Sequence, residues 1–502
     1  MNTRIISNLT TSIRINLLVL LLLLSSSLAA QTIQNSEQIK EEQKVEQGEQ
    51  KVEPREQLTE DQNEKKEEQK KARRDAVKQH IRTHLRPYGF VRNYFTFDTR
   101  ESLAGTGDLF SYLPLDNKWN QTETEAQASG IQREDLNAQS SFRFLSLTTR
   151  LGLDVVGYQV GSTQFSGKVE ADFYTGLSGV TGVALLRLRH AYMTLTWDSL
   201  SMGKSGNIAR VDLLMGQTWH PMALDLPPTL CLNSGAPFGP FSRTPQVKLD
   251  ARLAGWFSLT AAAMWQMQYT SAGPDGSSAN YIKYSKTPEV FIGLNFNHQD
   301  ALLVKAGVDI LSISPCHIGT LVSPSGTEVQ VRVRERLTTF TPFLYFQYKA
   351  GDFMLQAKSV FAESGEHVNL NGGYAVSRQN ADGSRSYTPT RNSTTWVCLS
   401  YGKRIKGVLF AGYVRNFGTK ESIISATDFY FSKNSFSNLN RAYRVAPNIL
   451  WTIGRFQLGA EYELTSAQYG DKSQLNLANG LAETDLHWVT NHRVQVMTKF
   501  NF

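Results

Sequence analysis

Apolar and polar side chains alternate along most of the chain after residue 86, and the last ten residues show this pattern best. Successive side chains of a strand point to opposite faces, so a period of two predicts β-strands. The two faces of the last strand are Val494, Val496, Thr498, Phe500 and Phe502, and Arg493, Gln495, Met497, Lys499 and Asn501. An apolar face of about ten residues is typical of a tilted strand between lipid and water. An amphipathic strand at the end of a soluble sheet is the alternative interpretation.

The same pattern predicts sixteen strands, separated by stretches rich in Gly, Asn, Asp, Ser and Pro. They are placed at 88–98, 139–157, 164–176, 184–198, 208–219, 245–256, 257–270, 285–297, 301–312, 337–350, 352–362, 392–402, 406–417, 441–453, 455–466 and 491–502. Connections after even-numbered strands are short, and most of those after odd-numbered strands are long. This parity is typical of outer-membrane barrels, which have tight periplasmic turns and long outer loops.

We therefore predict an all-β fold, a transmembrane antiparallel β-barrel of about 16 strands. In hydrocarbon, an unpaired sheet edge costs several kcal/mol per backbone group, so the sheet must close on itself. The last strand is expected to pair with the first, near Phe90 to Phe97. A barrel of this size is too wide for side chains to fill and encloses an aqueous channel.

The first 86 residues differ from the rest of the chain. Residues 1–30 have basic residues, the apolar run Leu17 to Leu24 and then small residues, which is the pattern of a secretory signal peptide. Residues 31–86 are rich in Glu, Gln, Lys and Arg and predict a charged periplasmic segment, either a disordered linker or a coiled coil over 56–86. Residues 87–502 form the predicted barrel. Export without a later membrane helix indicates the bacterial outer membrane, with its lipid and lipopolysaccharide as surroundings.

Composition narrows the possible partners. The 502 residues carry 52 Lys and Arg against 45 Asp and Glu, a net charge of +7, or +5 without Arg4 and Arg14 of the signal peptide. This modest excess does not predict nucleic-acid binding. Cys231, Cys316 and Cys398 lack the spacing of a metal site, so neither metal nor cofactor is predicted. A disulfide between Cys231 and Cys316 is possible in an oxidising compartment, but we favour free thiols.

Alternation also predicts which side chains face the lumen. The expected pore-lining cations are Arg150, Lys168, Arg187, Arg189, Lys248 and Arg252. Acids are expected on other strands, at Asp309, Glu461 and Glu463. Such a transverse field attracts anions at a narrow point, unless the opposite charges simply neutralise each other. A register error of one residue would invert any of these strands.

The same alternation predicts an outward face. Leu147, Leu151 and Leu153 are expected to face lipid, and His190 and Tyr192 also fall on the outer face. Because a polar group in lipid is costly, the last two indicate either a subunit contact or a position in an aromatic belt at the membrane rim.

The connection 220–243 is unusually apolar and rich in Pro for an outer loop. Loops normally stay polar and on the surface, so this loop is expected to fold into the barrel and narrow the pore. Asp225 and Arg243 are the predicted constriction residues. A loop buried at a subunit contact is the alternative.

Three segments carry a resemblance: Leu186-Arg-Leu-Arg-His-Ala-Tyr192, Leu213-Leu-Met-Gly-Gln-Thr-Trp219 and Arg243-Thr-Pro-Gln246. They resemble the DcaP-type trimeric outer-membrane porins. The resemblance implies a sixteen-stranded homotrimer, a constriction loop after the fifth strand, and basic wall residues, above all Arg187 and Arg189, that favour small anionic organic solutes. The final Phe502 resembles the signal that the barrel-assembly machinery recognises in such proteins.

These observations favour an outer-membrane porin, a passive diffusion channel for small hydrophilic, preferably anionic, solutes. A surface adhesin or structural anchor using loops 99–138 and 363–391 is the first alternative. A barrel-embedded hydrolase is the second, with His190 beside a Ser or Thr as its candidate. No catalytic residue and no enzymatic activity are predicted.

Overall fold

The structure, a computed structural model, describes residues 71, 83–106, 108–175, 184–201, 207–432 and 434–502. The chain separates into two units, residues 1–77 and 78–502, and the second contains the barrel. The predicted signal peptide and nearly all of the predicted charged segment lie outside the described residues. Within the described part of the chain, no helix has the length and apolarity needed to cross a membrane.

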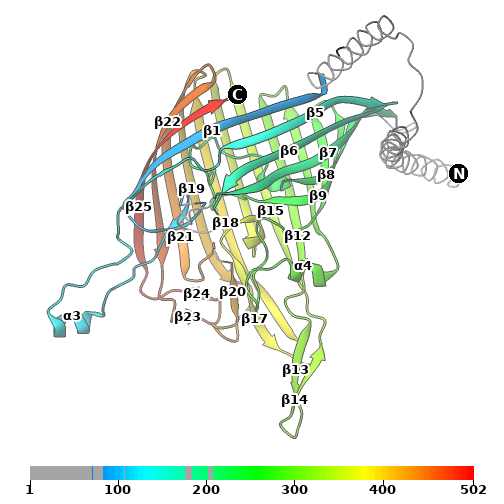
Figure 1. Ribbon diagram of the computed structural model, residues 1–502. Helices are drawn as coiled ribbons and strands as arrows, with labels where there is room; N and C mark the ends of the chain where they lie inside the picture. The colour runs from blue at the N-terminus through cyan, green and yellow to red at the C-terminus, as the bar shows by residue number, and fades with distance from the viewer. Residues whose placement is uncertain (1–70, 72–82, 107, 176–183, 202–206, 433) are drawn as a thin grey trace, which may run out of the picture. The chain divides into compact units, whose positions relative to one another are not determined.

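Sixteen antiparallel strands form a closed barrel, as the alternation predicts (Figure 1). They are β1 (Leu85–Asp98), β5 (Arg150–Val160), β6 (Thr163–Tyr174), β7 (Leu185–Ser201), β8 (Asn207–Trp219), β9 (Arg243–Ala254), β10 (Phe257–Met264), β11 (Glu289–His298), β12 (Leu302–Ile313), β15 (Leu337–Ala350), β16 (Phe353–Glu363), β18 (Arg385–Tyr401), β19 (Ile405–Thr419), β21 (Leu439–Ile453), β22 (Phe456–Tyr469) and β25 (His487–Asn501). β25 pairs with β1 from Phe90↔Asn501 to Asp98↔Arg493. This pairing confirms the predicted closure.

The parity of the connections is also confirmed. Tight turns such as 351–352 and 454–455 join the strands at one end, and the long connections lie at the other end (Figure 1). The long connections contain β2 (Ser102–Gly105), β3 (Phe110–Pro114), α3 (Glu123–Ser129), β4 (Ser141–Leu145), η2 (Pro221–Ala223), α4 (Asn280–Ser285), β13 (Ile318–Val322), β14 (Glu328–Arg332), η3 (Glu366–Val368), β17 (Gly373–Gln379), β20 (Phe429–Phe431), β23 (Leu475–Asn476) and β24 (Leu481–Ala482).

The outer face of the wall is apolar. Along β19, exposed and buried positions alternate, with Leu409 and Tyr413 exposed between buried neighbours. Aromatic side chains are exposed near both ends of the strands, for example Trp451 near the short turns and Trp488 near the long loops. An apolar band with aromatic belts is the surface of a transmembrane barrel. The chain is therefore an outer-membrane β-barrel.

The predicted orientation of His190 and Tyr192 is wrong. In β7, Leu188 pairs with Ala171 and His190 pairs with Glu170, so Arg189 is an extra residue in the ladder. Such a β-bulge moves every later side chain to the opposite face. His190 consequently lies beside Glu170 on the inner face and is buried. These two residues therefore do not indicate a subunit contact.

Leu147 is also misplaced by the simple alternation. A turn at 146–149, in which Thr148 has a φ of 70°, separates β4 from β5. Leu147 is buried with Tyr94 and Leu230 rather than exposed to lipid. Leu151, after the turn, is 49% exposed as predicted.

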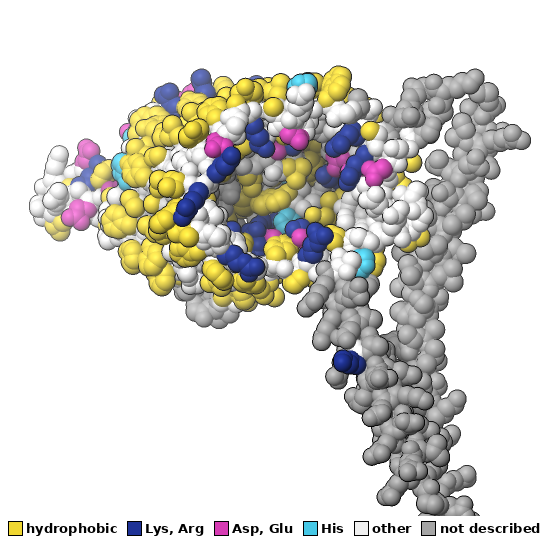
Figure 2. Space-filling model, turned by 90° about the horizontal axis from the view of Figure 1, so that it is seen from above, with side chains coloured by type: hydrophobic (Ala, Val, Ile, Leu, Met, Phe, Trp, Pro, Cys, Tyr) yellow, Lys and Arg dark blue, Asp and Glu magenta, His cyan; other side chains and the backbone are white. Residues whose placement is uncertain are grey.

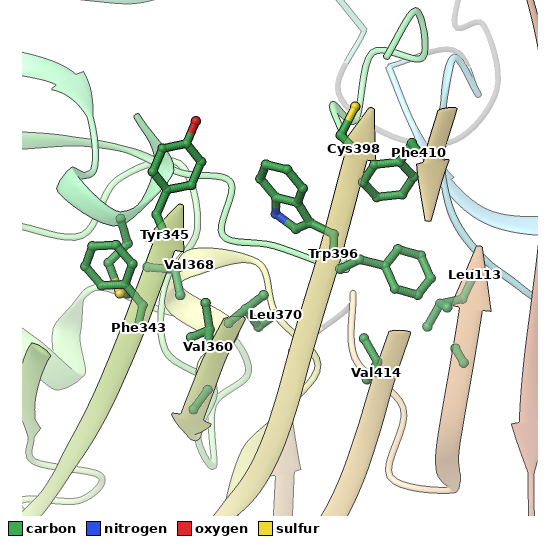
Figure 3. Packing of buried hydrophobic residues seen from close by; sticks show 14 of the residues in the cluster. Leu113, Phe343, Tyr345, Val360, Val368, Leu370, Trp396, Cys398, Phe410 and Val414 are labelled. Carbon is green, nitrogen blue, oxygen red and sulfur yellow. The ribbon is translucent and has the colours of Figure 1, made fainter. Parts of the chain in front are cut away.

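The hydrophobic core lies inside the barrel, because loops fold into it. Figure 3 shows wall side chains such as Phe343, Trp396 and Phe410 packed with Leu113 of β3 and with Val368 and Leu370, which follow β16. Met222 and Phe238 of the connection 220–242 belong to the same cluster. The predicted inward folding of that connection is therefore correct.

A second inward segment, residues 101–115, was not predicted. All five residues of β3 are buried. Two arginines of the wall bind the backbone of this segment: Arg493 donates to the carbonyl of Leu109 (Nη1–O 3.1 Å), and Arg444 donates to that of Ser111 (Nη2–O 2.8 Å). The apolar run from Leu109 to Pro114 is the sequence signal that could have revealed it.

Charged wall residues also hold the connection 220–242. Glu461 of β22 accepts the backbone N–H of Leu230 at 2.7 Å, and Lys358 of β16 donates to the carbonyl of Met222 at 2.7 Å. Both side chains are almost completely buried. Hydrogen bonds to buried charged groups are stronger than neutral ones, so these contacts fix the loop at two points on the wall.

Candidate functional site

Arginines from four strands surround two carboxylates of β6 inside the barrel. Arg187 forms a bidentate pair with Asp172, with both N–O distances at 3.0 Å. Arg189 reaches both acids, at 2.7 Å from Glu170 Oε1 and 2.7 Å from Asp172 Oδ2. Arg187 and Arg189 lie on the inner face with the acids, as the alternation predicts, although Arg189 is the extra residue of the bulge.

Arg150 of β5 and Arg92 of β1 extend the group. Arg150 Nη1 lies 3.4 Å from Glu170 Oε1, and its buried Nε has no hydrogen-bond partner in the part of the chain that the structure describes. Arg92 donates to Thr148 Oγ1 from Nε and Nη2, at 3.1 and 2.9 Å. Both guanidinium groups stack on the ring of Phe90.

Arg243 at the start of β9 completes the group, which we call the arginine wall: Arg92, Arg150, Arg187, Arg189 and Arg243. Arg243 is 2% exposed and lies over the rings of Trp219 (4.6 Å) and Phe241 (5.9 Å). Its Nη1 has no hydrogen-bond partner among the described residues. Five arginines against two carboxylates leave an excess of positive charge, and a buried guanidinium N–H without an acceptor is suited to an anionic ligand.

Two cavities border the arginine wall. The larger, of about 430 Å³, is lined by Arg187, Arg243, Gln268, Tyr112 and Tyr269, among others. The smaller, of about 100 Å³, is lined by Arg92, Arg150, Arg187 and Arg189 together with the tip of the connection 220–242. Arg187 and Phe110 line both cavities. The Arg187 side chain therefore lies between the two cavities.

Two phenols complete the lining of the larger cavity. The hydroxyls of Tyr112 and Tyr269 lie 2.9 Å apart. Burial raises the pKa of Tyr112 well above its ordinary value and also raises that of Tyr269. Both remain neutral hydrogen-bond donors, so they add no negative charge to the site.

A third cavity, of about 340 Å³, lies nearer the short turns and is lined by Lys248, Asp250, Arg252 and Lys305. Lys248 pairs with Asp250 at 2.7 Å, and Lys305 pairs with Asp225 of the inward loop at 2.8 Å. Figure 2 shows this end of the barrel, where charged side chains surround a central hollow.

Most of the predicted site residues thus lie at two different places in the barrel, the arginine wall and the third cavity. Arg150, Arg187, Arg189 and Arg243 belong to the arginine wall, whereas Lys248, Arg252 and Asp225 lie at the third cavity. Lys168 belongs to neither, because it pairs with Asp154 at 2.9 Å and contacts Tyr88. Arg92 was not among the predicted site residues. Its position in β1, on the face opposite to Val91 and Asn93, was the sequence signal that could have revealed it.

The acids predicted on the far side of the lumen are engaged elsewhere. Glu461 holds the inward loop, Glu463 lies 3.3 Å from Arg444, and Asp309 lies beside two histidines. The transverse field expected from the sequence is therefore weakened on its acidic side. The three cysteines are free thiols.

His190, the candidate of the hydrolase hypothesis, lies between a hydroxyl and an acid. Its Nδ1 is 3.0 Å from Thr218 Oγ1, and its Nε2 is 3.7 Å from Glu170 Oε1. The second distance exceeds that of a hydrogen bond, and Glu170 is already bound by Arg189 and Tyr88. This arrangement lacks the acid–histidine contact that activates a nucleophile.

No protein-family model and no curated protein matches the sequence. Among solved structures, the outer-membrane channel DcaP of Acinetobacter baumannii matches with a TM-score of 0.57 and 18% identity, over 83% of this chain and 97% of that chain. An anion-selective porin from Comamonas acidovorans matches with a TM-score of 0.46 and 12% identity, over 83% of this chain and 99% of that chain. The second TM-score is below 0.5 and supports nothing about this chain, whereas the likeness to DcaP shows the fold.

Proposed function

We propose that this barrel, which has the fold of the outer-membrane channel DcaP, is a porin for small hydrophilic solutes and favours anionic ones. The observation that carries the proposal is that Arg187 lines both cavities beside the arginine wall. Rings of basic side chains attract anions and repel cations at a constriction. Arg187 and Arg243 line the larger cavity, and Arg92, Arg150, Arg187 and Arg189 line the smaller, so a solute in either cavity meets these arginines.

Selectivity measurements test this proposal. In planar bilayers under a salt gradient, the reversal potential of the wild-type channel is expected to show anion preference. Arg187→Gln and Arg243→Gln are expected to shift it toward cations, because each removes a positive charge from the path. Arg133→Gln is the matched control, since Arg133 stacks on Trp119 in an outer loop. No conductance at all, or equal reversal potentials for all four proteins, contradicts the proposal.

We also propose that the chain is exported through its signal peptide, inserted by the barrel-assembly machinery and assembled as a homotrimer. The resemblance of segments 186–192, 213–219 and 243–246 to trimeric porins supports the last point. Light scattering of the detergent-solubilised protein, corrected for bound detergent, measures its mass. A monomer at all protein concentrations excludes the trimer without affecting the channel proposal.

A further inference from the structure

Four titratable side chains meet in the barrel interior, apart from the arginine wall. They are Glu289 at the start of β11, Asp309 of β12, His220 before η2 and His367 of η3, and none is more than 1% exposed. His220 Nε2 lies 2.7 Å from Glu289 Oε1 and 3.6 Å from Asp309 Oδ1. His367 Nε2 lies 3.1 Å from Asp309 Oδ2 and 3.7 Å from Glu289 Oε1.

The cluster is short of positive charge. Among the described residues, no Lys or Arg pairs with Glu289 or Asp309. His220 Nδ1 accepts a hydrogen bond from the Met222 amide at 3.2 Å, so its proton is on Nε2 and it is a neutral donor to Glu289. His367 alone can supply at most one positive charge against two buried carboxylates. Burying an unbalanced charge is expensive.

Unpartnered atoms lie in the same cluster. Glu289 Oε2 and Asp309 Oδ1 are buried and lack a hydrogen-bond partner within the described parts of the chain, although both belong to groups that bind cations strongly when ionised. One oxygen of Glu289 and one of Asp309 lie within 4.8 Å of each other, and His367 Nε2 lies within 3.7 Å of an oxygen of each carboxylate. Mixed imidazole and carboxylate ligands are typical of Zn²⁺ and of other divalent transition metals.

From this geometry we infer that Glu289, Asp309 and His367 bind a divalent transition metal, with His220 holding Glu289 in place from outside the coordination shell. A hydrogen bond to a ligating carboxylate is a common supporting contact around metals. The sequence predicts no metal site, because the four residues come from four separate elements and show no ligand spacing along the chain. The site does not depend on which solute the channel passes.

The metal would have a structural role. His220 begins the connection 220–242, and His367 lies in the connection after β16, which also packs inside the barrel. A metal bound by Glu289, Asp309 and His367 ties the connection after β16 to β11 and β12. His220, through its hydrogen bond to Glu289, ties the connection 220–242 to the same strands. A metal that binds only the folded chain stabilises it by an amount that grows with the logarithm of its affinity.

Metal content tests the inference. The full chain, without a histidine tag, is unfolded in urea with a chelator, refolded in detergent with Zn²⁺ or without metal, and desalted. The wild type is expected to retain about one zinc per chain and to unfold at a higher temperature than the metal-free protein. Refolding with Co²⁺ is expected to give the visible absorption bands of bound cobalt.

Variants separate this site from other histidines of the chain. Asp309→Asn and His367→Gln are expected to retain at least about tenfold less zinc than the wild type, because each loses one ligand. His367 is in a loop, so its variant tests the site even if Asp309→Asn does not fold. Glu335→Gln is the control, since Glu335 is a buried acid bonded to Tyr387 and Arg385.

Three results would overturn the inference. The first is a wild type that retains no more zinc than the two ligand variants. The second is a folded His367→Gln protein that retains a full equivalent. The third is a wild type without bound metal whose thermal stability falls as pH rises, which would mean that protons on the histidines balance the carboxylates instead.

Discussion

Buried arginines occur in two settings in this barrel. Arg493 is saturated: it forms a bidentate pair with Asp98, at 2.8 and 2.9 Å, and donates to loop carbonyls. Arg150 and Arg243, in contrast, each have one buried nitrogen that lacks a hydrogen-bond partner among the residues the structure describes. The first setting holds structure together, and the second leaves hydrogen-bonding capacity for a solute. The same residue type therefore has different consequences when it is removed.

Removing Arg493 is expected to destabilise the barrel strongly. In Arg493→Gln, the buried Asp98 loses its bidentate partner and keeps only Arg143 at 3.5 Å as a cation, and breaking such a buried pair costs about 3 to 5 kcal/mol. Urea unfolding of the protein in lipid vesicles measures the change. The double variant Asp98→Asn with Arg493→Gln is expected to recover part of the loss, because both charges are gone. A loss below about 1 kcal/mol would mean that the pair behaves as a surface ion pair.

The cysteines are expected to differ in reactivity. Cys231 and Cys398 are buried, and burial raises the pKa of the Cys231 thiol, whereas Cys316 is half-buried in an outer loop. A thiolate must be accessible to react. A bulky maleimide should therefore label Cys316 first in the folded protein and all three thiols in urea, as mass spectrometry of peptides would show. Equal labelling of Cys231 in the folded state would contradict the inward position of its loop.

At the scale of elements, the connection 220–242 behaves as part of the interior. Its polar backbone is satisfied by wall side chains, and its apolar side chains join the core. A buried loop must have partners for its backbone groups. Alternation requires only that an inward-facing position be polar. The barrel strands have charged residues such as Lys358 at some of these positions because the loop backbone needs strong hydrogen-bond partners.

Lys358→Met is expected to loosen this connection. The substitution leaves the carbonyls of Met222 and Asp225, now bound at 2.7 and 3.0 Å, without their charged donor. The expected cost is about 1 to 3 kcal/mol, with larger or noisier single-channel conductance as the loop moves. Lys403→Met is the control, because Lys403 is 81% exposed in a short turn. Unchanged conductance in Lys358→Met would show that this contact does not hold the constriction.

At the scale of the whole molecule, closure depends on the fit between β1 and the end of the chain. Gly89 is opposite Leu151 on β5 and accepts a hydrogen bond from the Phe502 amide at 3.1 Å. A Cβ at Gly89 would lie 2.5 Å from the Phe502 ring and 2.6 Å from the carbonyl oxygen of Arg150. The ring can rotate, but the carbonyl belongs to the paired strand.

Gly89→Ala is accordingly expected to weaken closure by about 1 to 3 kcal/mol, the usual cost of overpacking. This loss is measured after refolding by semi-native electrophoresis, as the fraction of the protein that migrates in the folded form. Gly407→Ala is a matched control in another wall strand, where a Cβ would meet no atom within 4 Å. Equal folding of the two variants would show that the contact between β1 and the end of the chain tolerates the extra methyl group.

The sequence by itself determined the sixteen strands, their order, the parity of the connections and the inward position of the loop 220–242. Each of these follows from local patterns, namely a period of two, turn residues and an apolar loop. Alternation also places Arg150, Arg187 and Arg189 on the inner face, because it assigns a face to each residue of a regular strand.

Only the tertiary structure decided how these side chains combine. The bulge at Arg189 depends on how β7 pairs with β6, so the sequence of β7 alone places His190 on the wrong face. The hydrogen bonds between Arg444 and the carbonyl of Ser111, and between Glu461 and the amide of Leu230, join residues that are distant along the chain. The physical reason is that alternation specifies a face, whereas contacts across the lumen depend on closure and on the loops that fill it.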